Sequence, residues 1–266
     1  MTQVEPDDFM TKVKYHPAAM HVRTLRKRVQ DVPPAAKLRL SSSLRESIRD
    51  DFQECNSVDD TIEFSRRHMG KGAVQIPSEI EMAIAYIAQR EPRFMCDIGT
   101  FDGGTSLLFR RFLPSITQMI CIDLYVKNKS FLKLLAPPNQ SQLFIDASSY
   151  ADRTVKRVTD IVGTRQMDVL FIDGDHRYEG ALGDFLAYRG FVRDGGTILF
   201  HDIVTDHGGS AWSGGVPQLW RELSAIYPST EFIDDPNQDG FGIGAIEYDP
   251  AVELPSSLAL HTTHTQ

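Results

Sequence analysis

Acidic side chains stand at or beside the ends of five short apolar runs in this chain of 266 residues. Ligands of open parallel sheets bind outside the carboxyl ends of the strands, so acids at successive strand ends meet around one crevice. A single aspartate there is weak evidence, because Asp is also a common turn former and helix cap. Five in register indicate a site that repels pyrophosphate and suits a ribose-bearing cofactor with a positive centre. The five are Asp97, Asp123, Asp146, Asp173 and Asp202.

The loop after the first apolar run carries glycines that let a backbone approach a ligand. It reads Gly99-Thr100-Phe101-Asp102-Gly103-Gly104, and the helix that follows offers free N–H groups. A dinucleotide fold requires Gly-x-Gly-x-x-Gly, and Phe101 replaces the second glycine, which lets pyrophosphate approach. A nicotinamide enzyme is therefore disfavoured. At the next two strand ends, Asp123 can accept hydrogen bonds from both ribose hydroxyls and Asp146 can contact a ring amino group.

From Arg93 onward, short apolar runs alternate with helical stretches. The predicted strands are Phe94–Gly99, Met119–Leu124, Leu143–Asp146, Asp168–Asp173, Thr197–His201, Glu231–Ile233 and Gly242–Tyr248. The helices between them are Thr105–Phe112, Lys129–Leu135, Tyr150–Val162, Tyr178–Gly190 and Val216–Tyr227. Such a pattern predicts an α/β fold with a mostly parallel sheet covered on both faces. Only a turn separates the last two of the seven strands, so the sheet should end in an antiparallel hairpin.

A helical extension should precede this sheet. Pro33 and Pro34 interrupt an arm with one or two short predicted helices, around His21–Gln30 and Ala36–Asp50, and Ser57–Met69 forms a further one. Residues 78–81 match a capping box at the start of a fourth helix. We therefore expect an N-terminal helical arm or cap (residues 1–75), a main domain (76–252) and a frayed tail (253–266).

The net charge of -8 is unevenly distributed. Residues 1–50 hold ten Lys and Arg against six Asp and Glu, whereas the other 216 residues carry -12. An acidic body disfavours nucleic acid as the main partner. No stretch approaches the roughly 18 apolar residues that span a bilayer, and the N-terminal residues lack a signal-peptide pattern. Three scattered cysteines favour neither a disulfide framework nor a zinc cluster, so we expect a cytoplasmic protein without a membrane partner.

The run from Asp97 to Tyr248 resembles the class I S-adenosylmethionine-dependent methyltransferases. Two segments are similar to a narrower branch: Gln75-Ile76-Pro77 through the Gly103-Gly104-Thr105-Ser106 turn, and Leu170–Gly180 with Phe200-His201-Asp202. That branch comprises the macrolide-sugar and rhamnosyl O-methyltransferases of natural-product pathways and the cephalosporin-hydroxylase-like group. The resemblance implies a Rossmann-like fold, S-adenosylmethionine as cofactor and a role in antibiotic or other natural-product biosynthesis.

The resemblance also implies a role for each matching residue. The methionine part of the cofactor would be held by Asp97, Gly99, Thr100, Gly104, Thr105 and Ser106. Asp123 would bind the ribose, Asp146 would lie near the adenine, and Asp173 would face both the cofactor and the acceptor. Asp173 and Asp202 match ligands of a divalent metal, Mg²⁺ or Mn²⁺, and His176 matches a general base.

These last residues form a coherent catalytic set. A neutral hydroxyl is a poor nucleophile, but a bound metal lowers its pKa and a histidine near neutral pH takes its proton. His201 stands where several metal-dependent relatives carry a second carboxylate. As a third ligand it would favour Mn, Fe or Zn over Mg²⁺, or it only orients its neighbours. In the alternative without a metal, Asp173 and Asp202 bond loop N–H groups and His176 deprotonates the acceptor alone.

The Gly- and Ser-rich segment Thr205–Gly215 is either a mobile lid, with Trp212 as an acceptor contact, or a disordered connector. His207 within it is a candidate second base.

The leading hypothesis is an O-methyltransferase that acts on a hydroxyl of a small molecule, first a sugar of a secondary metabolite, as a homo-oligomer. The helical arm would cover the substrate side or build a dimer interface. One alternative is an N-methyltransferase that acts on an amino sugar or a peptide without a metal. Another is a catalytically silent nucleotide-binding subunit.

Overall fold

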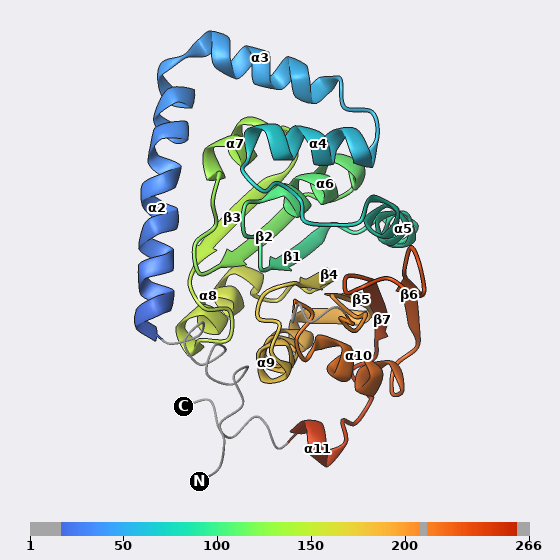
Figure 1. The fold of residues 1–266 in the computed structure, drawn as a ribbon. Helices are drawn as coiled ribbons and strands as arrows, with labels where there is room; N and C mark the ends of the chain where they lie inside the picture. The colour runs from blue at the N-terminus through green and yellow to red at the C-terminus, as the bar shows by residue number, and fades with distance from the viewer. Residues whose placement is uncertain (1–16, 208–211, 260–266) are drawn as a thin grey trace.

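The structure is a computed structural model that describes residues 17–207 and 212–259. Within these residues, four helices precede the first strand and run from blue to teal in Figure 1. They are α2 (Pro17–Leu40), α3 (Ser42–Gln53), α4 (Val58–His68) and α5 (Pro77–Ala88). Among the described residues, no helix has the length and apolar character that crossing a membrane requires.

Within the described residues, seven strands form a sheet in the order β3-β2-β1-β4-β5-β7-β6. The strands are β1 (Phe94–Ile98), β2 (Gln118–Asp123), β3 (Ser141–Asp146), β4 (Met167–Ile172), β5 (Val192–His201), β6 (Ser229–Phe232) and β7 (Ile243–Tyr248). The first five pair in parallel. Strand β7 runs antiparallel to both β5 and β6. The predicted mostly parallel sheet with an antiparallel final hairpin is confirmed.

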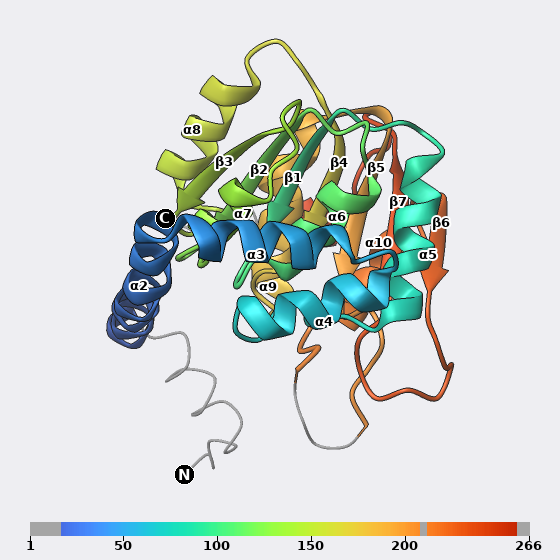
Figure 2. The ribbon, with the colours of Figure 1, turned by 90° about the horizontal axis from the view of Figure 1, so that it is seen from above.

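Helices cover both faces of this sheet, as Figure 2 shows. They are α6 (Gly104–Phe112), α7 (Lys129–Leu134), α8 (Asp152–Val162), α9 (Tyr178–Tyr188) and α10 (Val216–Ser224). Successive strand residues point to opposite faces, so Met95 packs in the layer of α4–α7 and Cys96 in the layer of α8–α10. Cys96 and Cys121 are both fully buried, in agreement with their predicted place in the core.

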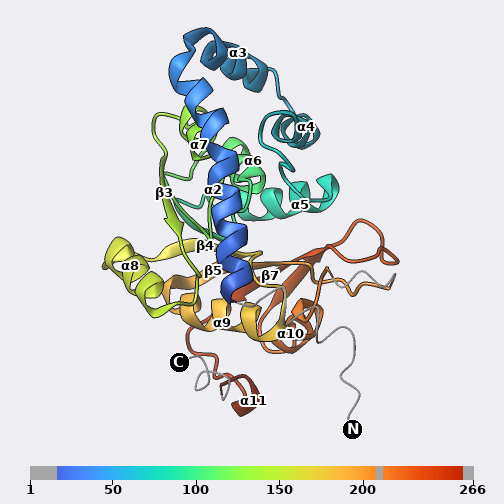
Figure 3. The same cartoon turned by 60° about the vertical axis from the view of Figure 1, so that its left-hand side comes forward.

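The predicted interruption of the helical arm at Pro33 and Pro34 is wrong, because both prolines lie inside the continuous helix α2. A proline inside a helix removes an N–H donor, and its ring crowds the carbonyl of residue i−4, so the pair weakens α2 locally. Contacts with the segment after β2 hold α2 in place, because Asp31 accepts hydrogen bonds from Tyr125 Oη (3.0 Å) and Asn128 N (3.0 Å). Figure 3 shows α2 as one continuous helix in front of the sheet.

The predicted capping box at residues 78–81 is also wrong. Helix α5 begins one residue earlier, at Pro77, whose fixed φ suits the first helical position. Glu79 is buried, and its carboxylate accepts hydrogen bonds from the backbone N–H groups of Asp234 (3.2 Å) and Gly242 (2.9 Å) and from Gln238 Nε2 (2.6 Å). Glu79 therefore fixes the loop between β6 and β7.

Two further boundaries differ from the prediction. Strand β5 begins at Val192, five residues before the predicted start at Thr197. Asp194-Gly195-Gly196 form an irregularity inside the strand, with Gly195 at φ +64° and a register shift against β4. In the predicted frayed tail, residues 256–259 form the short helix α11, and Leu258 is buried in the core. The remainder of that tail, residues 260–266, lies outside the described residues.

Candidate active site

A cavity of about 710 Å³ lies at the carboxyl ends of the parallel strands. Gly99, Asp123, Asp173 and Asp202 from four successive strand ends reach it, as does His176. One face of helix α2 forms another part of the wall, through Met20, Arg23, Thr24 and Lys27 at helical spacing. The sequence therefore predicted the strand-end half of this cavity.

The glycine loop holds its shape through contacts with its neighbours. Gly99 has φ +92°, and a Cβ there would overlap the carbonyl oxygen of Asp173, so the ends of β1 and β4 touch. A Cβ at Gly104 would overlap the backbone of Ala73. Only glycine permits these two approaches, and the loop can therefore leave room for a ligand at Gly99.

Asp97 supports the glycine loop from within the protein. Its carboxylate accepts hydrogen bonds from Thr100 Oγ1 (3.0 Å) and Ser106 Oγ, and burial raises its pKa to about 7. None of these three residues lines the cavity, and neither do Gly104 and Thr105. Among the residues predicted to hold the methionine part, Gly99 lines the cavity, and the others lie behind it. Their direct contact with the cofactor stays a prediction.

The two acids at the ends of β2 and β3 differ in their access to the cavity. Asp123 lines it, accepting hydrogen bonds from Phe101 N (3.0 Å) and Tyr125 N (2.9 Å) and pairing with Lys27 Nζ of α2 (3.1 Å). Asp146 instead pairs with Lys129 Nζ (2.7 Å) and accepts a hydrogen bond from Val126 N (3.1 Å). Asp146 does not line the cavity, whereas residues 147–150 next to it do. The adenine contact through Asp146 stays a prediction.

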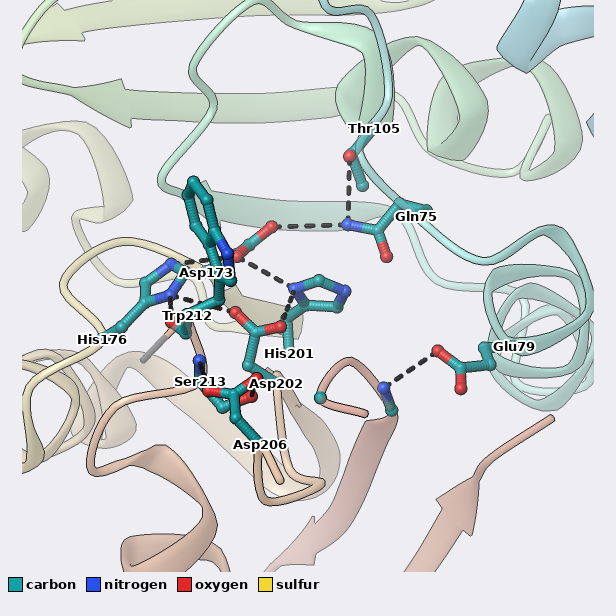
Figure 4. A network of polar contacts seen from close by, with 12 residues as sticks. Gln75, Glu79, Thr105, Asp173, His176, His201, Asp202, Asp206, Trp212 and Ser213 are labelled. Carbon is teal, nitrogen blue, oxygen red and sulfur yellow. Dashed lines mark hydrogen bonds and ion pairs between the residues drawn. The ribbon is translucent and has the colours of Figure 1, made fainter. Parts of the chain in front are cut away.

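Asp173, His201 and Asp202 form a compact cluster at the ends of β4 and β5 (Figure 4). One ligand atom from each residue lies within 4.8 Å of the others. His201 Nδ1 is 3.2 Å from Asp173 Oδ1 and 3.3 Å from Asp202 Oδ1, while its Nε2 is buried without a partner. Burial alone would lower the pKa of His201, but the two carboxylates outweigh it and raise that pKa well above its usual value.

These contacts allow two states of the cluster. A protonated His201 can act as an internal cation between the two aspartates. Two carboxylates and an imidazole at this spacing also fit a divalent metal, which would displace the ring proton if it bound through Nδ1.

His176 faces the same cluster with a defined orientation (Figure 4). Its Nδ1 lies 2.5 Å from the carbonyl oxygen of Trp212 and 3.0 Å from Asp202 Oδ2. Both oxygens can only accept, so Nδ1 carries the hydrogen and donates it. In the neutral ring this leaves a lone pair on Nε2, which lies 3.8 Å from Asp173 Oδ1. The arrangement prepares Nε2 to take a proton beside the acidic cluster.

Three positioning residues beside the cluster were not predicted. Gln75 Nε2 lies 3.4 Å from both Asp173 Oδ2 and Thr105 Oγ1, and it joins the glycine loop to the cluster. Asp206 accepts a hydrogen bond from Ser213 N (2.7 Å) and so closes the base of the loop that carries Trp212. Gln75 belongs to a segment that resembles the methyltransferase branch, but the resemblance gave it no role. The spacing of Asp206 and Ser213 in the sequence did not indicate that they contact each other.

Residues 208–211 of the predicted lid lie outside the described residues. The Trp212 side chain is 67% exposed, and Trp212 lines the cavity. His207 is not among the lining residues, and its backbone N–H donates to Asp239. The arrangement favours His176 over His207 as the base.

Comparison with known proteins agrees with this site. Residues 96–203 match the model of a family described as a methyltransferase domain. The chain is 32% identical over 164 residues to the uncharacterized protein y4gI of Sinorhizobium fredii, a match that covers 57% of this chain and 17% of the relative. A second match, 34% identical to the uncharacterized protein R132 of Acanthamoeba polyphaga mimivirus, covers 40% of this chain and 49% of the relative. The chain thus spans about half or less of these curated relatives.

Two solved structures share the fold. An O-methyltransferase from Bacillus cereus in complex with S-adenosylhomocysteine has a TM-score of 0.55 at 13% identity, with 79% of this chain and 100% of that chain covered. The O-methyltransferase TomG from Streptomyces achromogenes, involved in tomaymycin synthesis and in complex with S-adenosylmethionine, has a TM-score of 0.52 at 17% identity, with 74% and 91% covered. Residues 96–203 thus match a methyltransferase domain, and the sheet that contains them has the fold of these two structures. The predicted fold is confirmed, and the family match agrees with the predicted enzyme class.

Proposed function

We propose that this chain is an S-adenosylmethionine-dependent O-methyltransferase whose acceptor is a small molecule, first of all a sugar hydroxyl of a secondary metabolite. The observation that carries this proposal is the position of His176. Its Nδ1–H is held by Asp202 and the Trp212 carbonyl, and its Nε2 is left free beside Asp173 in the strand-end cavity. A poised base is what a hydroxyl acceptor needs and a free amine does not.

The cofactor would occupy the part of the cavity between Gly99 and Asp123. The carboxylate of Asp123 suits the ribose hydroxyls, and residues 147–150 suit the adenine edge. When bound, S-adenosylmethionine supplies a methyl group on a positively charged sulfur. The strand-end carboxylates stabilise that positive charge, and they disfavour an anionic cofactor in the same space.

The reaction would proceed as an in-line displacement beside His176. The acceptor oxygen forms a bond to the methyl carbon while the carbon–sulfur bond breaks, and the electron pair of that bond stays on sulfur. His176 Nε2 takes the hydroxyl proton, and Asp202 stabilises the resulting imidazolium through Nδ1–H. Holding both groups in one cavity supplies the orientation that the displacement requires.

A divalent metal would be held by Asp173, His201 and Asp202. It would lower the pKa of a bound hydroxyl and orient it toward the methyl group. The imidazole in this set favours Mn, Fe or Zn over Mg²⁺. The protonated state of His201 supports the competing hypothesis, an N-methyltransferase without a metal, because the imidazolium then offsets one of the two carboxylate charges without a metal.

Labelled S-adenosylmethionine offered with matched sugar and amino-sugar acceptors tests the proposed acceptor. Transfer of label to the hydroxyl compound supports O-methylation. Transfer only to the amine supports the competing hypothesis, and transfer to neither contradicts the proposed acceptor class.

We predict that replacing Lys27 with methionine raises the affinity for S-adenosylhomocysteine about two- to fivefold, the range expected for a partly exposed ion pair. Lys27 Nζ forms an ion pair with Asp123 Oδ1, the atom to which a ribose hydroxyl would donate. Cofactor binding therefore has to displace the lysine. Isothermal titration calorimetry measures the change, with Lys37→Met on an exposed part of α2 as the control. Weaker binding by the Lys27 variant would show instead that this lysine holds the cofactor.

From the sequence we further propose a cytoplasmic homo-oligomer. The outer face of α2 supports the assembly, because Val22, Leu25, Val29 and Val32 are 55–64% exposed at spacings of three and four residues. Light scattering of the purified chain measures its mass in solution, and a monomer at all concentrations would contradict this proposal.

A further inference from the structure

A second cavity of about 400 Å³ lies away from the strand ends, between helices α3 and α6 and the segment of residues 134–140. Three arginines line it: Arg49 from α3, and Arg110 and Arg111 from α6. No Asp or Glu is among the residues that line it within the described chain. The protein has a net charge of -8, whereas the lining of this cavity is positively charged. A positively charged cavity attracts anions.

Arg110 is the most buried of the three, with 2% of its surface exposed. Its Nε donates to Gln140 Oε1 (3.1 Å) and its Nη1 to Gln142 Oε1 (2.7 Å) and the Leu132 carbonyl (3.0 Å). These acceptors are all neutral. Nη2 is buried without a partner, and burial lowers the pKa of the guanidinium. A buried charge without a counter-ion is unfavourable, so an anion bound nearby would stabilise it.

The other two arginines extend the positive charge to the cavity entrance. Arg111 donates to the backbone carbonyls of Gln53 and Cys55, and its guanidinium lies 4.7 Å from the centroid of the Phe52 ring. Arg49 is exposed, and it forms no ion pair with a carboxylate in the part of the chain that the structure describes. Neither Arg110 nor Arg111 has a carboxylate partner there either. No described carboxylate therefore lies within ion-pair distance of the three arginines.

The remaining walls supply an apolar surface beside this charge. Phe52, Leu107, Leu134 and Leu135 line the cavity, and its volume falls in the range that small organic ligands occupy. We propose that this cavity binds an organic anion, with a phosphate or carboxylate head on the arginines and a short apolar body against these side chains. The inference does not depend on the proposed methyl transfer, because the two cavities share no lining residue.

Calorimetry on the full chain tests this site with octyl phosphate and octanoate as anionic probes and octanol as the neutral one. We expect one octyl phosphate or octanoate per chain, with octanol binding at least tenfold more weakly, as the loss of charge-assisted bonds implies. The affinities of octyl phosphate and octanoate show whether the arginines prefer a phosphate or a carboxylate group. Saturating S-adenosylhomocysteine should leave the binding unchanged, because the cofactor cavity is separate.

Matched variants locate the binding. Arg49→Gln removes an exposed guanidinium without disturbing a buried contact, and we expect about a three- to tenfold loss of octyl phosphate affinity. Arg157→Gln, on the exposed face of α8, is the control and should bind as the unaltered chain does. Three results would overturn the proposal: no binding of either anion, equal binding by octanol, or equal binding by the Arg49 and Arg157 variants. Arg110→Gln adds a second test if circular dichroism shows that it folds.

Discussion

Replacing His176 with alanine lowers the turnover number for methyl transfer by about 10²- to 10⁴-fold, the contribution typical of a positioned general base. The affinity for S-adenosylhomocysteine should stay close to that of the unaltered chain. The reason is geometric: His176 Nδ1–H is fixed by Asp202 Oδ2 and the Trp212 carbonyl, which leaves Nε2 free. Removing the ring deletes the proton acceptor and leaves Gly99 and Asp123 in place for the cofactor.

His207→Ala is the matched control, because His207 follows the end of the neighbouring strand β5 but does not line the cavity. It should retain most of the turnover. Separate measurement of turnover by product formation and of cofactor affinity by calorimetry distinguishes loss of the base from loss of the site. An alanine variant at position 176 that turns over normally, or a loss confined to the His207 variant, would remove His176 from its assigned role.

If the proposed metal is bound by the cluster, excess chelator should lower the rate of O-methylation by about 10²- to 10³-fold, since a Lewis acid lowers the barrier by several kcal/mol. The expected order of rescue is Mn²⁺ above Mg²⁺, because His201 would supply a nitrogen ligand. Asp202→Asn should show the same loss, and added metal should not restore it. The variant also weakens the contact that orients His176, since Asp202 contacts His176 through Oδ2 and His201 through Oδ1.

Asp160→Asn, on the exposed face of α8, is the control for the loss of an acidic charge alone. Metal content measured on the purified chain and on the Asp202 variant gives a readout independent of activity. Full activity in excess chelator, with His176 still required, would show that His201 acts as the cation of the cluster and that no metal takes part.

The sheet and its acidic strand ends could be predicted because they follow local patterns. Buried parallel strands are short continuous apolar runs, and Asp123, Asp173 and Asp202 all reach the cavity from the ends of such runs. Position along a strand does not reveal which partner a carboxylate meets. Asp97 lies one residue before the end of β1 and accepts hydrogen bonds from Ser106 and Thr100, whereas Asp146 ends β3 and pairs with Lys129.

The N-terminal contribution could not be predicted for a related reason. The proline pair hid the continuity of α2, and only the packed structure brings Lys27 to Asp123 across 96 positions of sequence. Glu79 likewise looked like a helix-capping residue, although it fixes a loop more than 150 residues away. Long-range polar contacts of this kind depend on the fold and leave no local pattern. The structure therefore gives one basic residue of the N-terminal arm, Lys27, a partner that the sequence did not indicate.

Calorimetric titration of the purified chain with S-adenosylhomocysteine tests the proposed cofactor directly. We expect one molecule bound per chain, with affinity reduced at least tenfold by Asp123→Asn, because the carboxylate is the proposed acceptor for two ribose hydroxyls. Absence of binding by S-adenosylhomocysteine and by S-adenosylmethionine would contradict the proposed methyltransferase activity of this cavity.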